Sequence, residues 1–132
     1  MTRSPRFVPV AAWTDPRHRL GVRGERVALE YLIACGWDIE AHRFRLGRHD
    51  VDLVARRGSL VAFVEVKTRR GSAFGETVES VGSGKRRILA RVAECWRARY
   101  GRRGDVYRFD LIGLRPGPAG LVVEHVADAW RL

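Results

Sequence analysis

The amino-acid sequence predicts an α/β protein in which helices flank a central mixed β-sheet of about five strands. Two segments carry apolar residues at helical spacing, and five others have the alternation or β-branched composition of strands. Their order along the chain is helix, three strands, helix, two strands. This order is typical of an α/β sandwich around a mixed sheet.

The first helix is predicted within residues 17–36 and the first strand within residues 37–44. Gly36 provides a C-terminal stop for the helix. The helix has one apolar face, formed by Val27, Ala28, Tyr31, Leu32 and Cys35. The strand alternates so that one face is expected to carry Trp37, Ile39 and Ala41.

The next two strands are predicted as a hairpin within residues 49–70, joined by the two-residue loop Gly58-Ser59. Glycine at the first loop position suits a type II′ turn. Both faces of the second strand of this hairpin are apolar along most of its length, as expected for a strand that helices cover on both sides.

The loop fixes the pairing of the hairpin and so the place of its charged residues. With this turn, Asp52 lies opposite Glu65, and Asp50 lies opposite Lys67. Directly opposed side chains are roughly 4.5–5.5 Å apart at Cβ. Glu65 and Lys67 are therefore expected at the rim of a core.

The second half of the chain predicts a loop at residues 69–82, a helix after it and two more strands. Ser83 is expected to cap the helix, and the strands are expected at 105–113 and 121–126, separated by Pro116 and Pro118. The apolar stripe of the helix comprises Ile88, Leu89, Val92, Ala93, Trp96 and Tyr100.

The domain organisation follows from the same pass along the chain. Residues 1–18 are expected to form a flexible basic arm, and residues 19–132 a single domain. Segment 7–13 lacks the length and the cleavage site of a signal peptide, and no run approaches the roughly 20 apolar residues of a membrane helix. Cys35 and Cys95 lack metal-site spacing and are expected to be buried, reduced thiols. We therefore expect a cytoplasmic protein with no membrane partner.

The charge of the chain points to a polyanionic partner. A net charge of +10 and an isoelectric point near 11.1 are extreme for 132 residues. Nucleic acid is the commonest partner for such a field, and the alternative is a basic surface without a specific ligand.

The pairing of Asp52 with Glu65 has an electrostatic cost. Two ionised carboxylates about 4 Å apart repel by about 4 kcal/mol at an effective dielectric constant of about 20. A cation between them, a proton on one of them, or basic neighbours would offset this cost. A divalent cation is the economical solution, because Mg²⁺ typically takes one or two carboxylates together with waters and phosphate oxygens.

Lys67 stands out because the chain otherwise uses arginine. Of its 25 basic residues, only Lys67 and Lys85 are lysines. A lysine at 67 indicates a site that needs a compact ammonium group, although a surface salt bridge remains the alternative. Beside a metal, Lys67 could orient a water molecule or stabilise the charge that develops on a phosphate.

These residues resemble a known pattern. Asp52 followed by Glu65-Val66-Lys67 is similar to the core motif of the restriction-endonuclease-like, PD-(D/E)xK, nucleases. A wider set of motifs resembles the YraN family, small uncharacterised proteins similar to archaeal Holliday-junction resolvases. These motifs are "GERVALEYL" (24–32), "DVDLVA" (50–55), "FVEVKTR" (63–69), "FG" (74–75), Lys85 with "RI" (87–88), "RFDL" (108–111) and "HVADAW" (125–130).

The resemblance implies a restriction-endonuclease-like fold and a set of site residues. Asp52 and Glu65 would be metal ligands, with the carbonyl of Val66 as a third. Lys67 would be the catalytic lysine, and Glu25 would complete the site from the first helix.

The chain departs from the family just before Asp52. His49-Asp50 replaces the Gly-Glu that usually precedes the Ile-Asp pair, so an outer role for Asp50 is open. We interpret His49 as a loop residue.

Other polar and aromatic residues have two interpretations each. The basic residues that flank the site could hold phosphates or form a solvated charged face; they are Arg69, Arg70, Lys85, Arg86 and Arg87. Trp37, Trp96 and Trp130 are expected in the core, and Asp110 is expected to be a buried hydrogen-bonding acid.

Together the sequence and the resemblance predict a Mg²⁺- or Mn²⁺-dependent endonuclease, a phosphodiester hydrolase acting on DNA rather than RNA. Branched DNA or a repair intermediate would be its substrate, and a homodimer would match the two-fold symmetry of a four-way junction. The alternatives are a non-catalytic nucleic-acid-binding protein on a nuclease scaffold and a ribosome-associated basic protein.

Overall fold

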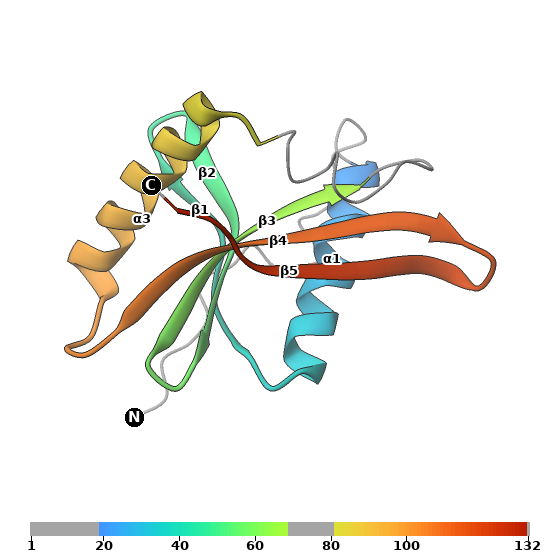
Figure 1. Ribbon diagram of the computed structural model, residues 1–132, viewed down its shortest axis with the longest axis horizontal. Helices are drawn as coiled ribbons and strands as arrows, with labels where there is room; N and C mark the ends of the chain where they lie inside the picture. Colours follow the sequence, from blue (N-terminus) through green and yellow to red (C-terminus); the bar gives the residue numbers. More distant parts are fainter. Residues whose placement is uncertain (1–18, 69–80, 132) are drawn as a thin grey trace.

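The computed structural model describes residues 19–68 and 81–131 and confirms the predicted α/β class (Figure 1). The helices and strands are α1 Arg19–Ala34, β1 Asp38–Leu46, β2 His49–Arg57, β3 Leu60–Thr68, α3 Ser83–Tyr100, β4 Val106–Gly117 and β5 Gly120–Trp130. The predicted arm at 1–18 lies outside the described residues, as does most of the predicted loop at 69–82. Among the described helices, none is long and apolar enough to cross a membrane.

The five strands form one mixed sheet in the order β1-β2-β3-β4-β5. Neighbouring strands are antiparallel except β3 and β4, which run parallel. Helices α1 and α3 lie on opposite faces of this sheet (Figure 1). The arrangement is consistent with a restriction-endonuclease-like fold.

The β2–β3 hairpin has the predicted turn and register. Its pairs run from Arg57 with Leu60 to Leu53 with Val64. Gly58 has a φ of 62°, whereas Ser59 keeps an ordinary negative φ, as a type II′ turn requires. The predicted turn is therefore confirmed over the whole ladder.

Side chains alternate along β3 between two hydrophobic clusters, one under each helix. Val61 and Phe63 pack in the α3 cluster, which also contains Leu89, Val92 and Trp96 of that helix. Ala62 and Val64 pack in the α1 cluster, with Ala28 and Leu32. Because helices cover both faces, β3 is apolar on both sides, as its sequence predicts. The three tryptophans expected in the core are buried, namely Trp37, Trp96 and Trp130.

A buried ion network ties β1 and β2 to the start of β4. Arg56 Nε donates to Glu40 Oε1 at 2.6 Å, and its two terminal nitrogens donate to the carboxylate of Asp105 at 2.7 and 2.9 Å. Hydrogen bonds from Arg56 lower the pKa of Asp105 to about 2. These charge-assisted hydrogen bonds hold the turn end of the β2–β3 hairpin against β1 and the start of β4.

Several local predictions are wrong. Ile39 lies in the α1 cluster but Ala41 lies in the α3 cluster, because the register shifts at Glu40 and turns the following residue to the other face. The N-cap of α3 is Gly82, and Ser83 is already the first helical residue. Cys35 is exposed and Cys95 half-buried, since one lies in the turn after α1 and the other on the flank of α3.

Strand β4 is longer than predicted and includes Pro116. Among the described residues, Pro116 pairs with Leu121 of β5.

Replacing Arg56 should destabilise the protein strongly. Arg56→Met leaves two carboxylates without their partner, and we expect a loss of about 3–5 kcal/mol in the free energy of unfolding, measured with urea. Arg26→Met is the control, because it breaks an exposed pair with Glu30 and should cost at most about 0.5 kcal/mol. Equal losses in the two variants would contradict the assigned role of the network.

Candidate functional site

The candidate site lies where β2 and β3 separate. Their ladder ends at Leu53 and Val64, one residue before Asp52 and Glu65 would pair. Beyond it the Val66 backbone N–H donates to Asp52 Oδ2 at 2.8 Å. The predicted pairs Asp52 with Glu65 and Asp50 with Lys67 are therefore not rungs of the ladder: Asp52 bonds the backbone of Val66 instead, and Asp50 pairs with Arg45 of β1.

A break in strand alternation places Asp52 at this opening. Phe44 and its partner Val51 pack in the α3 cluster, whereas Leu53, the partner of His42, packs in the α1 cluster. Residues 51 and 53 of a regular strand would share one face, so the face changes at Asp52. The change coincides on β1 with Arg43, which has a φ of 52°. Asp52 thus lies between the two layers.

Burial is the largest cause that raises the pKa values of both acids. Desolvation raises the pKa of Asp52 well above its usual value, and the nearby charge of Glu65 raises it further. Desolvation also raises the pKa of Glu65 to about 7, against the opposing charges of Lys85 and Lys67. Glu65 is only 3% exposed, and its Oε1 atom has no hydrogen-bond partner among the described residues. Burial therefore outweighs the two nearby ammonium groups at Glu65.

The donor set of this opening fits a small divalent cation with oxygen ligands. Among the described residues, no three His, Cys, Asp or Glu side chains gather closely enough to enclose a metal ion. A cation held here would therefore rest on Asp52 and Glu65, and Mg²⁺ typically takes one or two carboxylates with waters and phosphate oxygens.

The Val66 carbonyl faces the same opening. The Val66 N–H points to Asp52, and the N–H and C=O of a strand residue point to the same edge. The carbonyl oxygen therefore points toward Asp52, the orientation that a third ligand from Val66 needs.

Glu25 reaches the site from α1 and is already engaged. Its Oε2 atom lies 2.7 Å from His42 Nε2 and accepts a hydrogen bond from Arg43 Nε at 3.0 Å. Although burial opposes it, these hydrogen bonds lower the pKa of Glu25. The charge of Glu25 in turn raises the pKa of Asp52, so the two lie near each other. No motif indicated His42 or Arg43, whose contact depends on the packing of α1 against β1.

The basic residues around the site differ in their contacts. Lys85 Nζ lies 3.9 Å from Glu65 Oε2, while Arg87 is exposed. Arg86 donates to the Val81 carbonyl and lies over the Trp130 ring, so it is held by the protein itself. Lys67 makes no ion pair with any described residue. The predicted phosphate contacts Arg69 and Arg70 lie outside the described residues.

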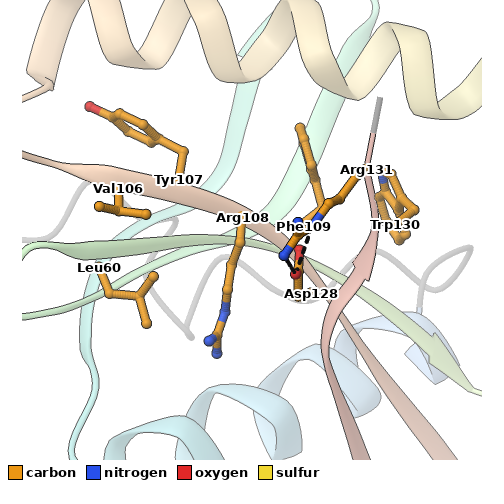
Figure 2. Close-up of a pocket in the computed structure, with 8 residues that line it drawn as sticks. All are labelled: Leu60, Val106, Tyr107, Arg108, Phe109, Asp128, Trp130 and Arg131. Atoms are coloured by element: carbon orange, nitrogen blue, oxygen red, sulfur yellow. Dashed lines mark hydrogen bonds and ion pairs between the residues drawn. The ribbon is translucent and has the colours of Figure 1, made fainter.

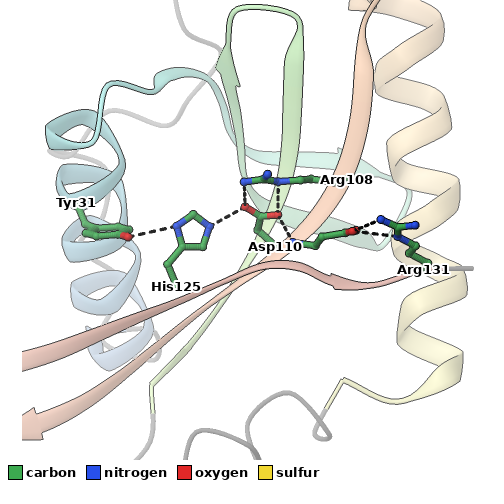
Figure 3. A network of polar contacts seen from close by, with 6 residues as sticks. Tyr31, Arg108, Asp110, His125 and Arg131 are labelled. Atoms are coloured by element: carbon green, nitrogen blue, oxygen red, sulfur yellow. Dashed lines mark hydrogen bonds and ion pairs between the residues drawn. The ribbon is translucent and has the colours of Figure 1, made fainter.

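Asp110 is the buried hydrogen-bonding acid that its apolar setting predicts (Figure 3). It accepts two hydrogen bonds from Arg108 at 2.8 and 3.0 Å and lies 2.6 Å from His125 Nε2. Burial opposes ionisation, but the bonds from His125 and Arg108 lower the pKa of Asp110. His125 Nε2 faces Asp110, and its Nδ1 lies 3.3 Å from the Tyr31 hydroxyl. This chain links β4 and β5 to α1.

A cavity of about 470 Å³ lies away from the carboxylates, beside Leu60 at the start of β3 (Figure 2). Leu60 is five residues from Glu65, or roughly 16 Å along a strand. The arginines of this cavity are paired with aspartates, Arg108 with Asp110 and Arg131 with Asp128. It is therefore separate from the candidate site.

Comparison with known proteins gives one consistent family. A model of the uncharacterised protein family UPF0102 matches residues 24–114. A UPF0102 protein of Symbiobacterium thermophilum is 43% identical over 102 residues, covering 77% of this chain and 86% of that protein. A UPF0102 protein of Erythrobacter litoralis is 42% identical over 113 residues, covering 86% of this chain and 93% of that protein. One of Geobacter sulfurreducens is 36% identical over 126 residues, covering 95% of this chain and 98% of that protein. The matched segment includes Glu25, Asp52, Glu65 and Lys67.

The raised pKa of Glu65 predicts how stability depends on pH without divalent metal. A carboxyl with a pKa of 4.5 when unfolded and about 7 when folded stabilises the protein below pH 4.5 and destabilises it as the pH rises to about 7. Glu65→Gln removes this dependence. In urea unfolding with EDTA, the variant should match the parent at pH 4 and exceed it by about 3 kcal/mol at pH 8.

Glu94→Gln is the control for this experiment, because Glu94 is an exposed acid on α3. It should not change the pH profile. If the profiles of parent and Glu65→Gln run parallel, the assigned burial of Glu65 is wrong.

Proposed function

This chain belongs to the uncharacterised protein family UPF0102, the YraN family, and we propose that it is a Mg²⁺- or Mn²⁺-dependent endonuclease that hydrolyses DNA phosphodiesters. One observation carries the proposal. Asp52 and Glu65 both lie where β2 and β3 separate, burial raises both pKa values, and Lys67 lies two residues further along β3.

The charge of the chain supports DNA as the partner. A net charge of +10 attracts polyanions, Lys85 lies at the opening, and Arg87 is exposed on the same helix. Their side chains could hold the phosphates that flank the cleaved bond. Arg86 is not available for this role because Val81 and Trp130 hold it.

The residues of the opening divide the chemistry among them. In hydrolysis a water oxygen forms a bond to phosphorus and one P–O ester bond breaks. A bound divalent cation would polarise the phosphate and lower the pKa of water. Asp52, Glu65 and the Val66 carbonyl would hold the cation, Glu25 would keep an ionised carboxylate beside them, and the Lys67 ammonium would stabilise the charge on the phosphate oxygens.

Divalent metal should stabilise the protein through Asp52. In thermal unfolding, Mg²⁺ or Mn²⁺ at about 100 times its Kd should add about 2.7 kcal/mol to the parent. Asp52→Asn should be more stable than the parent in EDTA, because repulsion is relieved, yet gain nothing from metal. Asp38→Asn, an exposed acid of β1, should respond as the parent does. Equal metal stabilisation of Asp52→Asn would exclude this metal site.

Cleavage tests the activity itself. With Mg²⁺ or Mn²⁺, branched, single-stranded and duplex DNA are incubated with parent, Asp52→Asn, Lys67→Ala and Lys67→Arg proteins. We expect cleavage by the parent and a loss of about 10²–10³-fold in rate for each site variant, including Lys67→Arg, because a guanidinium fork differs in shape from an ammonium group. Asp38→Asn serves as the active control. DNA binding without any cleavage would indicate a non-catalytic binding protein instead.

A further inference from the structure

We propose that a small apolar cavity next to the carboxylate pair binds one unpaired base of a DNA strand. This inference rests on the proposed function and specifies its substrate, which would carry an unpaired nucleotide close to the cleaved bond. The cavity has a volume of about 200 Å³ and is lined by Leu46, His49, Ile88, Arg91 and Val92.

The β1–β2 turn builds one wall of this cavity. Leu46 pairs with His49 across the two residues Gly47 and Arg48, and Gly47 has a φ of 62° that suits such a tight turn. The neighbours Phe44 and Val51 pack in the α3 cluster, so Leu46 and His49, two residues from each, also face α3. The turn thus extends the core on the α3 side into an open cavity.

Helix α3 builds the opposite wall and connects the cavity to the site. Ile88 and Val92 are one turn apart, and Val92 is buried whereas Ile88 is half-buried. Lys85, which lies 3.9 Å from Glu65, precedes Ile88 by three residues and Arg91 by six. These separations correspond to roughly 4.5 and 9 Å along the helix, or about one to three nucleotide steps of a B-form strand.

The chemistry of the cavity suits a base with its phosphate. Its walls are mainly apolar, from Leu46, Ile88 and Val92, and Leu46 is 37% exposed although it is a large hydrophobic residue. Two exposed arginines accompany it, Arg91 in the lining and Arg48 in the turn between Leu46 and His49. Apolar walls would take the face of a base, and the arginines would take the anionic backbone.

Only an unpaired base can use such a cavity. In a duplex both faces of a base are stacked on its neighbours, so wall side chains reach a base face only after the base has left the stack. Extrusion is cheapest where the base is already unpaired, which makes the cavity selective for bulged, branched or single-stranded DNA.

Binding in EDTA tests the inference without cleavage. Fluorescence anisotropy would compare a duplex with one bulged nucleotide, the same duplex with an abasic residue at the bulge, and a fully paired duplex. The parent should bind the base-containing bulge about tenfold more tightly than the other two. Leu46→Ser and, independently, Ile88→Ala should abolish this preference without weakening binding to the paired duplex.

Ile33→Ser is the matched control, because Ile33 is a large hydrophobic residue 54% exposed on α1. It should keep the preference. Thermal unfolding of each variant checks its fold, and the exposed Leu46 makes Leu46→Ser the safer variant. Equal binding of the bulged and abasic duplexes by the parent, or a preference that survives both substitutions, would overturn the inference.

The outcomes for the cavity and for the nuclease are distinguishable. Cleavage without a base preference would contradict the proposed role of the cavity and support the nuclease proposal. A base preference without cleavage would support a binding site for unpaired bases and contradict the nuclease proposal.

Discussion

The repulsion between Asp52 and Glu65 is the constraint around which the rest of this fold is arranged. Strand β3 is covered by α1 on one face and by α3 on the other, which makes its end dry enough to raise the pKa of Glu65 to about 7. The β2–β3 ladder stops one residue short of the pair, and the Asp52 side chain takes the Val66 N–H that a further rung would have used. The two helices therefore shield both acids from water, and the end of the β2–β3 ladder leaves the sheet open beside them.

Three other acids of the described core have hydrogen-bonding partners whose effect outweighs burial. The hydrogen-bond partner of Asp105 is Arg56. Those of Asp110 are Arg108 and His125, and those of Glu25 are His42 and Arg43. The pKa values of these three acids are lowered, whereas those of Asp52 and Glu65 are raised. At Asp52 and Glu65 the nearby lysines do not outweigh burial, and buried acids with raised pKa values are a typical mark of a functional site.

The sequence predicts the parts of this site that depend on local chemistry. The Gly58-Ser59 turn sets the hairpin register, and the period of two along β3 assigns Glu65 to the α3 side. The sequence could not predict the change of face at Asp52, because this change depends on the positive φ of Arg43 and on pairing with β1. The shift at Glu40 misplaced Ala41 for a similar reason. The contact between Tyr31 and His125 joins residues 94 apart in the sequence, and no periodic pattern carries that information.

The two lysines of the chain show why arginine would not serve at this pair. Both act on Glu65, whose pKa their charges lower, and they are the only lysines among 25 basic residues. Where the fold needs full neutralisation it uses guanidinium groups, as at Asp105 and Asp110, which occupy both carboxylate oxygens. An arginine at the opening would close the pair in the same way and exclude a metal ion. The ammonium of Lys85, 3.9 Å from Glu65 Oε2, moderates the repulsion, while the buried Glu65 Oε1 keeps no hydrogen-bond partner among the described residues.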